Sequence, residues 1–378
     1  MDIIDHPYFQ RLRRIKQLGM THYVYPGALH TRFHHALGAL HLMREAIEVL
    51  RNKDVEITDA EAEGVCCAIL LHDIGHGPFS HALEHTITNL HHEEISLMIM
   101  KKLNEEFSGR LSLAIEIYQG TYHKRFLHQL ISGQLDMDRM DYLKRDSFFT
   151  GVAEGTIGHD RIIKMLHVHD GQLVVEMKGL YSVEKFLLAR RFMYWQVYLH
   201  KTVLAAEHML ILCLKKAREL ALNGFHFGIN THLRKFLERP ADTGMGFSDE
   251  DLQDFLKLDD VDIAAAIKVF AECDDKILMK LANGLLDRKL FRCVLSNKPF
   301  TIDEKAELLG TVSEKHALSR EEAAELLIEG SESNMAYSVE KGEIKMIHKS
   351  GKVTDLSEVT ENVLDFKPLT KYFVCYPK

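Results

Sequence analysis

The sequence has 378 residues and a net charge of −8, with 46% hydrophobic and 27% charged residues, a composition typical of a globular protein with a large core. No apolar run approaches the roughly 20 residues of a membrane span, and the first residues lack the apolar core of a signal peptide. Six cysteines without a CxxC spacing argue against a disulfide framework, and the acidic balance argues against general nucleic-acid binding, so a cytoplasmic protein is expected.

The first part of the chain is predicted to form successive helices. Apolar spacing indicates helices over residues 33–50, from 58 or 59 to about 71, from 92 onward and over 136–149. An Asp-Gly turn within residues 167–176 predicts a β-hairpin. Between residues 182 and 222 no Pro or Gly interrupts a helical pattern, so one very long helix or two abutting helices are expected.

The last part of the chain is predicted to be helical with a short β tail. A loop rich in Gly, Asn and His follows residue 222, and helices resume near 248–285 and 319–329. After Tyr337, alternating runs about Lys341-Gly342 and Ser350-Gly351 predict a short antiparallel sheet. The whole chain is therefore expected to be mainly α with a small C-terminal α+β appendage.

The strongest chemical signal is the segment LLHDIGHGPFSH, residues 70–81. His72 and Asp73 are adjacent at the end of an apolar helix, which glycines and a proline then break, and His76 and His81 follow within one to two turns. Imidazole nitrogen and carboxylate oxygen suit Zn, Fe, Mn or Mg rather than a thiolate-binding ion. A polar helix end with exposed histidines is the alternative, but the crowding of imidazoles favours a metal site.

A metal site needs ligands beyond this pair, and two other helix starts offer them. RFHH lies upstream and QLDMDRMDYLKRD downstream. His35, His72, Asp73 and Asp138 would supply two nitrogens and two oxygens from three helices, leaving positions for water and substrate. Asp136 is chemically as suitable as Asp138, and spacing does not choose between them.

These motifs carry a family resemblance. The order H…HD…D, with RLRRIKQLGMTHYVYPGALHTRFHHALG (11–38) and DRMDYLKRD (138–146), resembles HD-domain deoxynucleoside triphosphate triphosphohydrolases, most closely the vertebrate branch that carries an added SAM domain. The similarity covers residues 2–215. It implies an HD-domain helical bundle over residues 1–222, including the long helix 182–222, followed by a C-terminal helical region, 223–378, that ends in the β tail.

The resemblance also implies roles for single residues. It makes His35, His72, Asp73 and Asp138 the metal ligands, and so favours Asp138 over Asp136. It implies that His92 and Glu93 form a pair that assists proton transfer, with His76 at the triphosphate and His81 near the scissile phosphate. The implied substrate contacts are Gln17, Leu18, Arg32, Arg139, Tyr142, Asp146, Arg190, Tyr194 and Tyr198.

Within that set, the resemblance places Gln17 and Asp146 at the sugar 3′-hydroxyl, and Leu18 and Tyr198 where they would exclude a 2′-hydroxyl. Two positions depart from the family pattern. Tyr194 stands where the best-known member has a histidine, and Arg139 replaces a lysine. Both departures concern base preference and rate rather than the class of reaction.

The expected function is hydrolysis of dNTPs to a deoxynucleoside and inorganic triphosphate by a metal-activated water that attacks the α-phosphorus. The resemblance implies one divalent metal (Fe, Mn, Zn, Ni or Mg), with a second Mg on the triphosphate. The alternatives are a nucleotidase, a binuclear phosphodiesterase with His76 and His92 as additional ligands, and a nucleotide-sensing module without turnover.

The expected partners are the nucleotide substrate and further copies of the chain, because family members are homo-oligomers. Asp5, Gln10 and Arg13 coincide with positions that contact a regulatory guanine nucleotide in the best-known member. The basic run RLRRIK (11–16) is either a local anion site or the solvated face of a helix.

Overall fold

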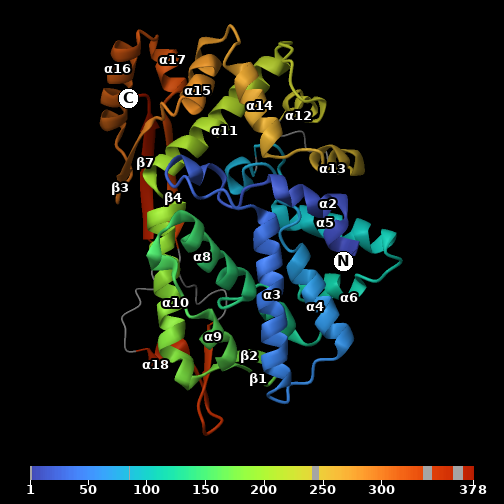
Figure 1. Cartoon of the computed structure of the whole chain (residues 1–378). Coiled ribbons are helices and arrows are strands. Elements are labelled where there is room, and N and C mark those ends of the chain that lie inside the picture. The colour runs from blue at the N-terminus through green and yellow to red at the C-terminus, as the bar shows by residue number, and fades with distance from the viewer. Residues whose placement is uncertain (1, 85, 241–246, 335–342, 361–368) are drawn as a thin grey trace.

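The structure is a computed structural model that describes residues 2–84, 86–240, 247–334, 343–360 and 369–378. The side chains of His81, Ala82, Asn334 and Leu369 lie outside this description. The fold is mainly helical, which confirms the predicted fold class (Figure 1).

The N-terminal part consists of short helical turns followed by two long helices. Its elements are α1 (Asp2–Asp5), α2 (Pro7–Gln10), η1 (Arg11–Arg14), η2 (Gly19–Tyr23), α3 (Arg32–Arg51) and α4 (Asp59–Leu71). At the start of α4, Thr58 accepts a hydrogen bond from the Glu61 backbone N–H, and the Glu61 carboxylate accepts one from the Thr58 N–H. The last residue of α4 directly precedes the His72–Asp73 pair, so the helix end fixes where these side chains begin.

The middle of the bundle contains the second half of the predicted helices. Its elements are η3 (Ser80–Leu83), α5 (His92–Glu106), α6 (Ser112–Tyr118), α7 (Arg125–Gln129), α8 (Met137–Thr150), η4 (Ala153–Gly155) and α9 (His159–Met165). Asp136 caps the start of α8, and Gly151 ends it in a left-handed conformation with a φ of 74°. The predicted helices from 92 and over 136–149 are confirmed as α5 and α8.

The segment predicted as one long helix or two abutting ones forms two. After η5 (Met177–Gly179) come α10 (Leu180–Met193), a single π-helical turn η6 (Tyr194–Tyr198) and α11 (Lys201–Leu222). The axes on either side of the break differ by 57°. No single helix within the described ranges has the length and apolarity of a membrane span, and the two segments together reach it only across this bend.

The remaining helices belong to the C-terminal part, coloured from yellow through orange to red in Figure 1. They are α12 (Thr231–Leu237), α13 (Asp249–Phe255), α14 (Asp260–Phe270), α15 (Lys276–Leu286), α16 (Ile302–His316), α17 (Arg320–Glu325) and α18 (Leu356–Val359). The predicted helices near 248–285 are confirmed. The predicted helix over 319–329 is too long, because the chain leaves α17 and enters a strand at Ile328; α16 was not predicted.

Two small sheets accompany the helices. One has the order β1 (Leu166–His169), β2 (Gln172–Glu176), β5 (Lys345–Ile347), β6 (Val353–Asp355), and the other has the order β3 (Arg292–Ser296), β7 (Leu369–Tyr376), β4 (Ile328–Asn334). The predicted hairpins at 167–176 and about Ser350-Gly351 are confirmed, whereas the Lys341-Gly342 turn lies outside the described residues.

The tail, however, does not form a sheet by itself. β2 pairs in parallel with β5, with Val175 opposite Met346, so the tail adds its strands to the hairpin that precedes α10. Parallel pairing between strands so far apart in sequence has no local signal, which is why the sequence alone did not predict it.

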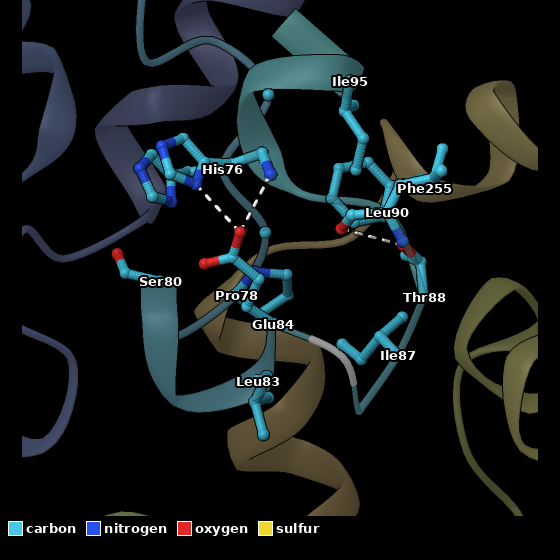
Figure 2. A pocket seen from close by; sticks show the side chains of 13 residues that line it. His76, Pro78, Ser80, Leu83, Glu84, Ile87, Thr88, Leu90, Ile95 and Phe255 are labelled. Atoms are coloured by element: carbon cyan, nitrogen blue, oxygen red, sulfur yellow. Dashed lines mark hydrogen bonds and ion pairs between the residues drawn. The ribbon is translucent and has the colours of Figure 1, made fainter. Parts of the chain in front are cut away.

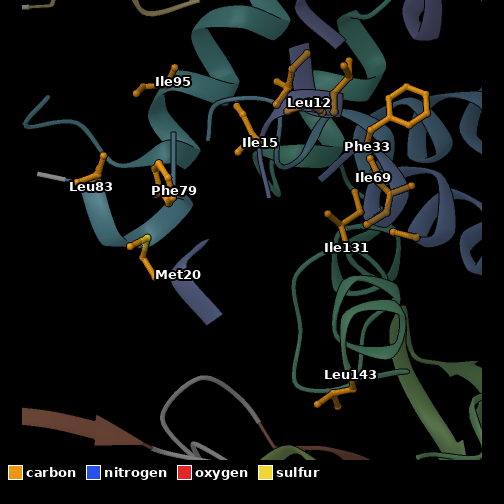
Figure 3. Close-up of a cluster of buried hydrophobic side chains, with 14 of the residues drawn as sticks. Leu12, Ile15, Met20, Phe33, Ile69, Phe79, Leu83, Ile95, Ile131 and Leu143 are labelled. Atoms are coloured by element: carbon orange, nitrogen blue, oxygen red, sulfur yellow. The ribbon is translucent and has the colours of Figure 1, made fainter. Parts of the chain in front are cut away.

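The core joins segments that are distant in sequence. Figure 3 shows part of this buried cluster, including Leu12 from η1, Ile69 from α4 and Leu143 from α8, none of which is exposed to solvent. Burying each such side chain contributes about 1.5–3 kcal/mol to folding. The helices that carry the metal-ligand candidates are therefore fixed by a common core.

Candidate functional site

The four predicted metal ligands come together from three helices. The Nε2 atom of His35 lies 3.1 Å from Asp138 Oδ1, 3.4 Å from His72 Nε2 and 3.7 Å from Asp73 Oδ2. His72 Nε2 lies 3.4 Å from both Asp73 Oδ1 and Asp138 Oδ1. Ligands that each sit about 2.0–2.2 Å from one divalent ion are about 3.0–3.5 Å apart, so the donor set fits such an ion.

Each imidazole is held by its other nitrogen. His72 Nδ1 donates to the Ile69 carbonyl at 2.6 Å, which leaves Nε2 with a lone pair that faces the cluster. His35 Nδ1 lies 2.8 Å from Asp141 Oδ2, and Arg145 in turn donates to both oxygens of Asp141. Contacts of this kind orient metal-binding histidines and raise their basicity.

The electrostatics of the cluster also favour a cation. Burial opposes ionisation of Asp138, but hydrogen bonds with His35 and His72 hold its pKa well below the ordinary value. Burial would lower the pKa of His35, yet Asp138 and Asp141 raise it to about 10. The carboxylates of Asp138 and Asp141 thus remain ionised and attract positive charge, which a proton or a divalent ion can provide.

Asp136 and Asp138 have different tasks in this arrangement. Asp136 accepts hydrogen bonds from the backbone N–H groups of Gly133 and Arg139, at 2.8 and 2.7 Å, and pairs with the Arg139 guanidinium. It therefore serves as the helix cap. The side chain of Asp138, two residues later, is the one that contacts the two histidines.

Two further imidazoles adjoin the cluster. The rings of His76 and His92 stack with centroids 3.8 Å apart and planes 15° apart, and His76 Nε2 lies 3.5 Å from Asp73 Oδ1. Ligand atoms of Asp73, His76 and His92 lie within 4.8 Å of one another, which makes them a second group able to hold a metal. Burial and then the charge of Arg32 hold the pKa of His76 well below its ordinary value, so its imidazole is neutral near pH 7.

The carboxylate that holds His92 is not the one the sequence indicated. His92 Nδ1 and its backbone N–H both lie 2.9 Å from Glu84 Oε1, and Figure 2 shows Glu84 pointing toward His76. Glu93 is exposed on the first turn of α5. The structure thus places Glu84, rather than Glu93, at His92 Nδ1, because neighbouring residues of a helix project in different directions. A role of Glu93 in proton transfer stays a prediction. The side chain of His81 lies outside the described structure.

A cavity of about 610 Å³ extends from this cluster. Asp73, His76, His92 and Asp138 line one part of it. All of the predicted substrate contacts also line it: Gln17, Leu18, Arg32, Arg139, Tyr142, Asp146, Arg190, Tyr194 and Tyr198. The volume lies within the range of about 300–1,000 Å³ that is usual for small-molecule sites.

Several polar atoms on the cavity wall have no hydrogen-bond partner among the described residues: Gln17 Oε1, Arg139 Nε, and Arg190 Nε and Nη1. The Arg190 side chain is more than nine-tenths buried. Arg32, by contrast, donates to Asp73 and to Ser80 Oγ, the latter at 2.8 Å. Buried unpartnered donors are costly to a protein, so those in this cavity indicate an anionic ligand that would accept from them.

A fixed hydrogen-bond chain lies farther along the cavity. Tyr198 donates to Asp146 Oδ2 at 2.8 Å, and His30 Nε2 contacts Asp146 Oδ1 at 2.7 Å. The His30 ring stacks on Phe149 with centroids 4.5 Å apart. Burial, followed by the Asp146 charge, holds the pKa of Tyr198 well above its ordinary value, so its hydroxyl remains a donor.

Several residues of the site were not predicted. Asp141 had a usable signal, because it lies one helical turn after Asp138 and shares its face. His30 and Glu84 lie in irregular segments, and Glu207, His208 and Glu332 enter the cavity from α11 and β4. Only the folded chain brings these residues to the site.

The residues predicted to contact a regulatory nucleotide lie elsewhere, on α1, α2 and η1. Gln10 Nε2 donates to the Ile4 carbonyl at 2.7 Å, and Arg13 Nε donates to Gln10 Oε1 at 2.8 Å. The Arg13 guanidinium lies 3.6 Å from the centre of the Phe33 ring. Asp5 is exposed. A regulatory site here stays a prediction.

Residues 32–146 match the HD domain, and residues 157–224 match the HD associated region. A crystal structure of a phosphohydrolase from Bacteroides thetaiotaomicron is 48% identical with a TM-score of 0.95, and the match covers 100% of this chain and 95% of that one.

Two curated relatives extend the comparison. YwfO of Bacillus subtilis is 32% identical, over 100% of this chain and 88% of the relative. A Dictyostelium discoideum protein named as a homolog of the deoxynucleoside triphosphate triphosphohydrolase SAMHD1 is 33% identical, over 56% of this chain and 45% of the relative.

Proposed function

This chain belongs to the HD-domain family of phosphohydrolases, and we propose that it hydrolyses deoxynucleoside triphosphates to a deoxynucleoside and inorganic triphosphate. The observation that carries this proposal is the continuous cavity that links the His35–His72–Asp73–Asp138 cluster, three arginines and the Asp146–Tyr198 pair. A nucleotide presents a reacting phosphate, a charged chain and a sugar, and these three kinds of group could contact them.

The arginines suit a triphosphate rather than a single phosphate. Arg32, Arg139 and Arg190 line the same cavity, and the free nitrogens of Arg139 and Arg190 offer donors to phosphate oxygens. Charge that develops on the leaving triphosphate would be stabilised by these groups without any rearrangement.

The cluster of four ligands would hold one divalent metal, which lowers the pKa of a bound water and polarises a phosphate oxygen. His92 is oriented at Nδ1 by Glu84, and its imidazole would exchange a proton with the reacting groups. His76, neutral and stacked on His92, adds a hydrogen-bonding nitrogen beside Asp73.

Selection of the deoxy sugar would depend on Tyr198, which ends the hydrogen-bond chain that runs from His30 through Asp146. The Tyr198 hydroxyl is fixed by Asp146, so the tyrosine ring is held at the cavity, and Leu18 lines the same cavity. A ribose 2′-hydroxyl would enter this space without a partner of its own, and an unsatisfied buried hydroxyl costs about 1–3 kcal/mol.

The test is a screen of the four dNTPs and the four NTPs under several divalent metals, with the products separated by chromatography. We expect deoxynucleoside and triphosphate from dNTPs and slow turnover of NTPs. Equal rates on GTP and dGTP, or release of monophosphate and pyrophosphate, would contradict the proposal and favour a more general nucleotidase.

A binuclear phosphodiesterase is the second candidate, because Asp73, His76 and His92 form a second group able to hold a metal. The metal content of the purified protein distinguishes the two. One ion per chain, with turnover of dNTPs, supports the triphosphohydrolase; two ions per chain, with turnover of phosphodiesters, supports the alternative. A protein that binds nucleotides without any turnover would be a sensing module.

A further inference from the structure

One end of the cavity is lined by acids that the proposed mechanism does not use. Glu207 lies on α11 and Glu332 on β4, so one comes from the HD associated region and the other from the C-terminal sheet. Both line the cavity that also holds the metal-ligand candidates.

The chain path brings Glu207 to the cavity after the predicted sugar contacts. Arg190, Tyr194 and Tyr198 follow one another at four-residue spacing up to the end of η6, and Leu204, Glu207 and Ile211 line the same cavity from α11, whose axis differs by 57° from that of the preceding segment. Tyr198 and Glu207 therefore stand on differently directed segments that share one cavity wall, and Glu332 joins them from β4.

An independent contact agrees with this placement. A Cβ atom built on Gly19 would lie 3.5 Å from Glu207 Oε1, and Gly19 follows Leu18, one of the sugar contacts. The glycine leaves the carboxyl group open to the cavity. Apolar side chains flank the same region, from Phe79, Leu204 and Ile211. Flat apolar walls with a polar end suit a nucleobase.

In the part of the chain that the structure describes, neither the Glu207 nor the Glu332 carboxyl group has a hydrogen-bond or ion-pair partner. Lys371, opposite Glu332 on β7, places its ammonium 4.6 Å from the centre of the Trp195 ring instead. Burial, and then the Glu332 charge, raises the pKa of Glu207 to about 8. The pair therefore holds a proton near pH 7 and still offers several acceptor oxygens.

We infer that Glu207 and Glu332 read the nucleobase and select bases that present adjacent N–H donors, with guanine bound best and thymine least well. Guanine offers N1–H and the N2 amino group side by side on its pairing edge. Thymine offers one N–H between two carbonyl oxygens, and these carbonyl oxygens would be repelled by the carboxyl oxygens of the protein. This inference rests on the proposed function, since it takes the cavity to hold a nucleotide.

The experiment measures kcat/KM for the four dNTPs with the wild-type protein and with Glu207→Leu and Glu332→Leu, two separate variants on separate elements that remove the acceptor oxygens at similar side-chain size. We expect the wild type to prefer dGTP over dTTP. Each variant should reduce that preference by about 10- to 100-fold, because a site built around one hydrogen-bonding edge loses discrimination when its acceptor is replaced.

Two matched controls are available. Glu219→Leu lies on α11, where Glu219 pairs with Lys216, and Glu329→Leu lies on β4, where Glu329 pairs with Lys305. Both remove a carboxylate from the same elements without touching the cavity, and should leave the base preference unchanged. Thermal unfolding of all variants identifies any that lose their fold.

A second readout separates this inference from the proposed function. Binding of dGTP and dTTP is measured by calorimetry in EDTA, where no hydrolysis occurs. If the wild type turns over no dNTP but binds dGTP more tightly than dTTP, and Glu207→Leu removes the difference, base reading stands and the proposed reaction fails. If dNTPs are hydrolysed but neither variant changes the ratio of dGTP to dTTP, the proposed reaction stands and base reading is overturned. An equal loss for all four dNTPs also overturns it.

Discussion

At the scale of single residues, the site depends on how each side chain is held from behind. His35 is fully buried, and its two nitrogens face different carboxylates, Asp138 in the cluster and Asp141 behind it. The ring therefore has one orientation, with Nε2 directed at the cluster. The same logic separates Asp136, whose oxygens cap α8, from Asp138, whose Oδ1 faces His35 and His72 in the cluster.

Asp141→Asn should weaken metal binding by about 10- to 100-fold, the usual cost of losing a partner that orients a ligating histidine. The metal affinity is measured by competition with a chelator of known affinity. The matched control is Asp136→Ala, which removes a helix cap and should lower stability by about 1 kcal/mol while the bound metal is retained. Equal metal affinity in Asp141→Asn and wild type would show that His35 is oriented without Asp141.

His92→Ala distinguishes proton transfer from metal binding. If His92, held by Glu84, carries a proton in the reaction, its removal should lower the turnover rate by about 10²–10⁴-fold. The metal content and the nucleotide affinity should then stay unchanged. Elemental analysis, calorimetry and turnover measure the three quantities. A fall from two ions per chain to one would instead assign His92 to a second metal, as its position beside Asp73 and His76 allows.

At the scale of elements, α4 has a capping box at its start, formed by Thr58 and Glu61, and the His72–Asp73 pair at its end. Glu61 accepts from the Thr58 N–H at 2.8 Å, from Tyr122 at 2.8 Å and from Lys124 at 2.9 Å. Burial alone would raise the pKa of Glu61, but these bonds hold it at about 2. The first turn of α4 is thereby tied to the segment before α7, which steadies the helix that ends at His72.

Glu61→Gln should destabilise the protein by about 2 kcal/mol at neutral pH, because the ionised carboxylate is what the partners stabilise. A group whose pKa is lowered on folding stabilises the protein above its unfolded value of about 4.3 and loses that contribution as pH falls toward 2. The free energies of unfolding of variant and wild type should therefore converge in acid. Glu63→Gln, on the exposed face of the same helix, is the control; a difference that does not depend on pH would contradict this account.

At the scale of the whole molecule, the C-terminal part is built into the HD region rather than attached to its end. β5 pairs with β2 through Val175 and Met346, both buried, and β4 brings Glu332 into the cavity. The predicted domain boundary at residue 222 remains a prediction, but the pairing of β2 with β5 across it allows a physical test. Strands that complete one another's sheet should unfold together.

Met346→Ala should destabilise the protein by about 2–5 kcal/mol, the usual cost of removing a buried methionine side chain. Differential scanning calorimetry should show that the transition of the HD region shifts to lower temperature, because β2 loses the packing of its neighbour. Lys345→Ala, the exposed neighbour on the same strand, is the control. Two separate transitions, of which only one moves, would mean that the two parts unfold independently.

The sequence by itself determined the local features of this protein. Helical periodicity and capping residues placed α3, α4, α5 and α8, because those signals act within a few turns of the chain. The two turns with glycine placed their hairpins for the same reason. The HD pair, with its crowded histidines, indicated a metal site and the family before any contact was known.

Only the tertiary structure decided which distant groups meet. It paired His92 with Glu84 rather than Glu93, turned Asp136 into a cap, and split the long helical segment at a π-helical turn. It also joined β2 to β5 and brought Glu207 and Glu332 to one cavity. These outcomes depend on packing between segments more than a hundred residues apart or on side-chain direction, and neither is encoded by the spacing of residues along the chain.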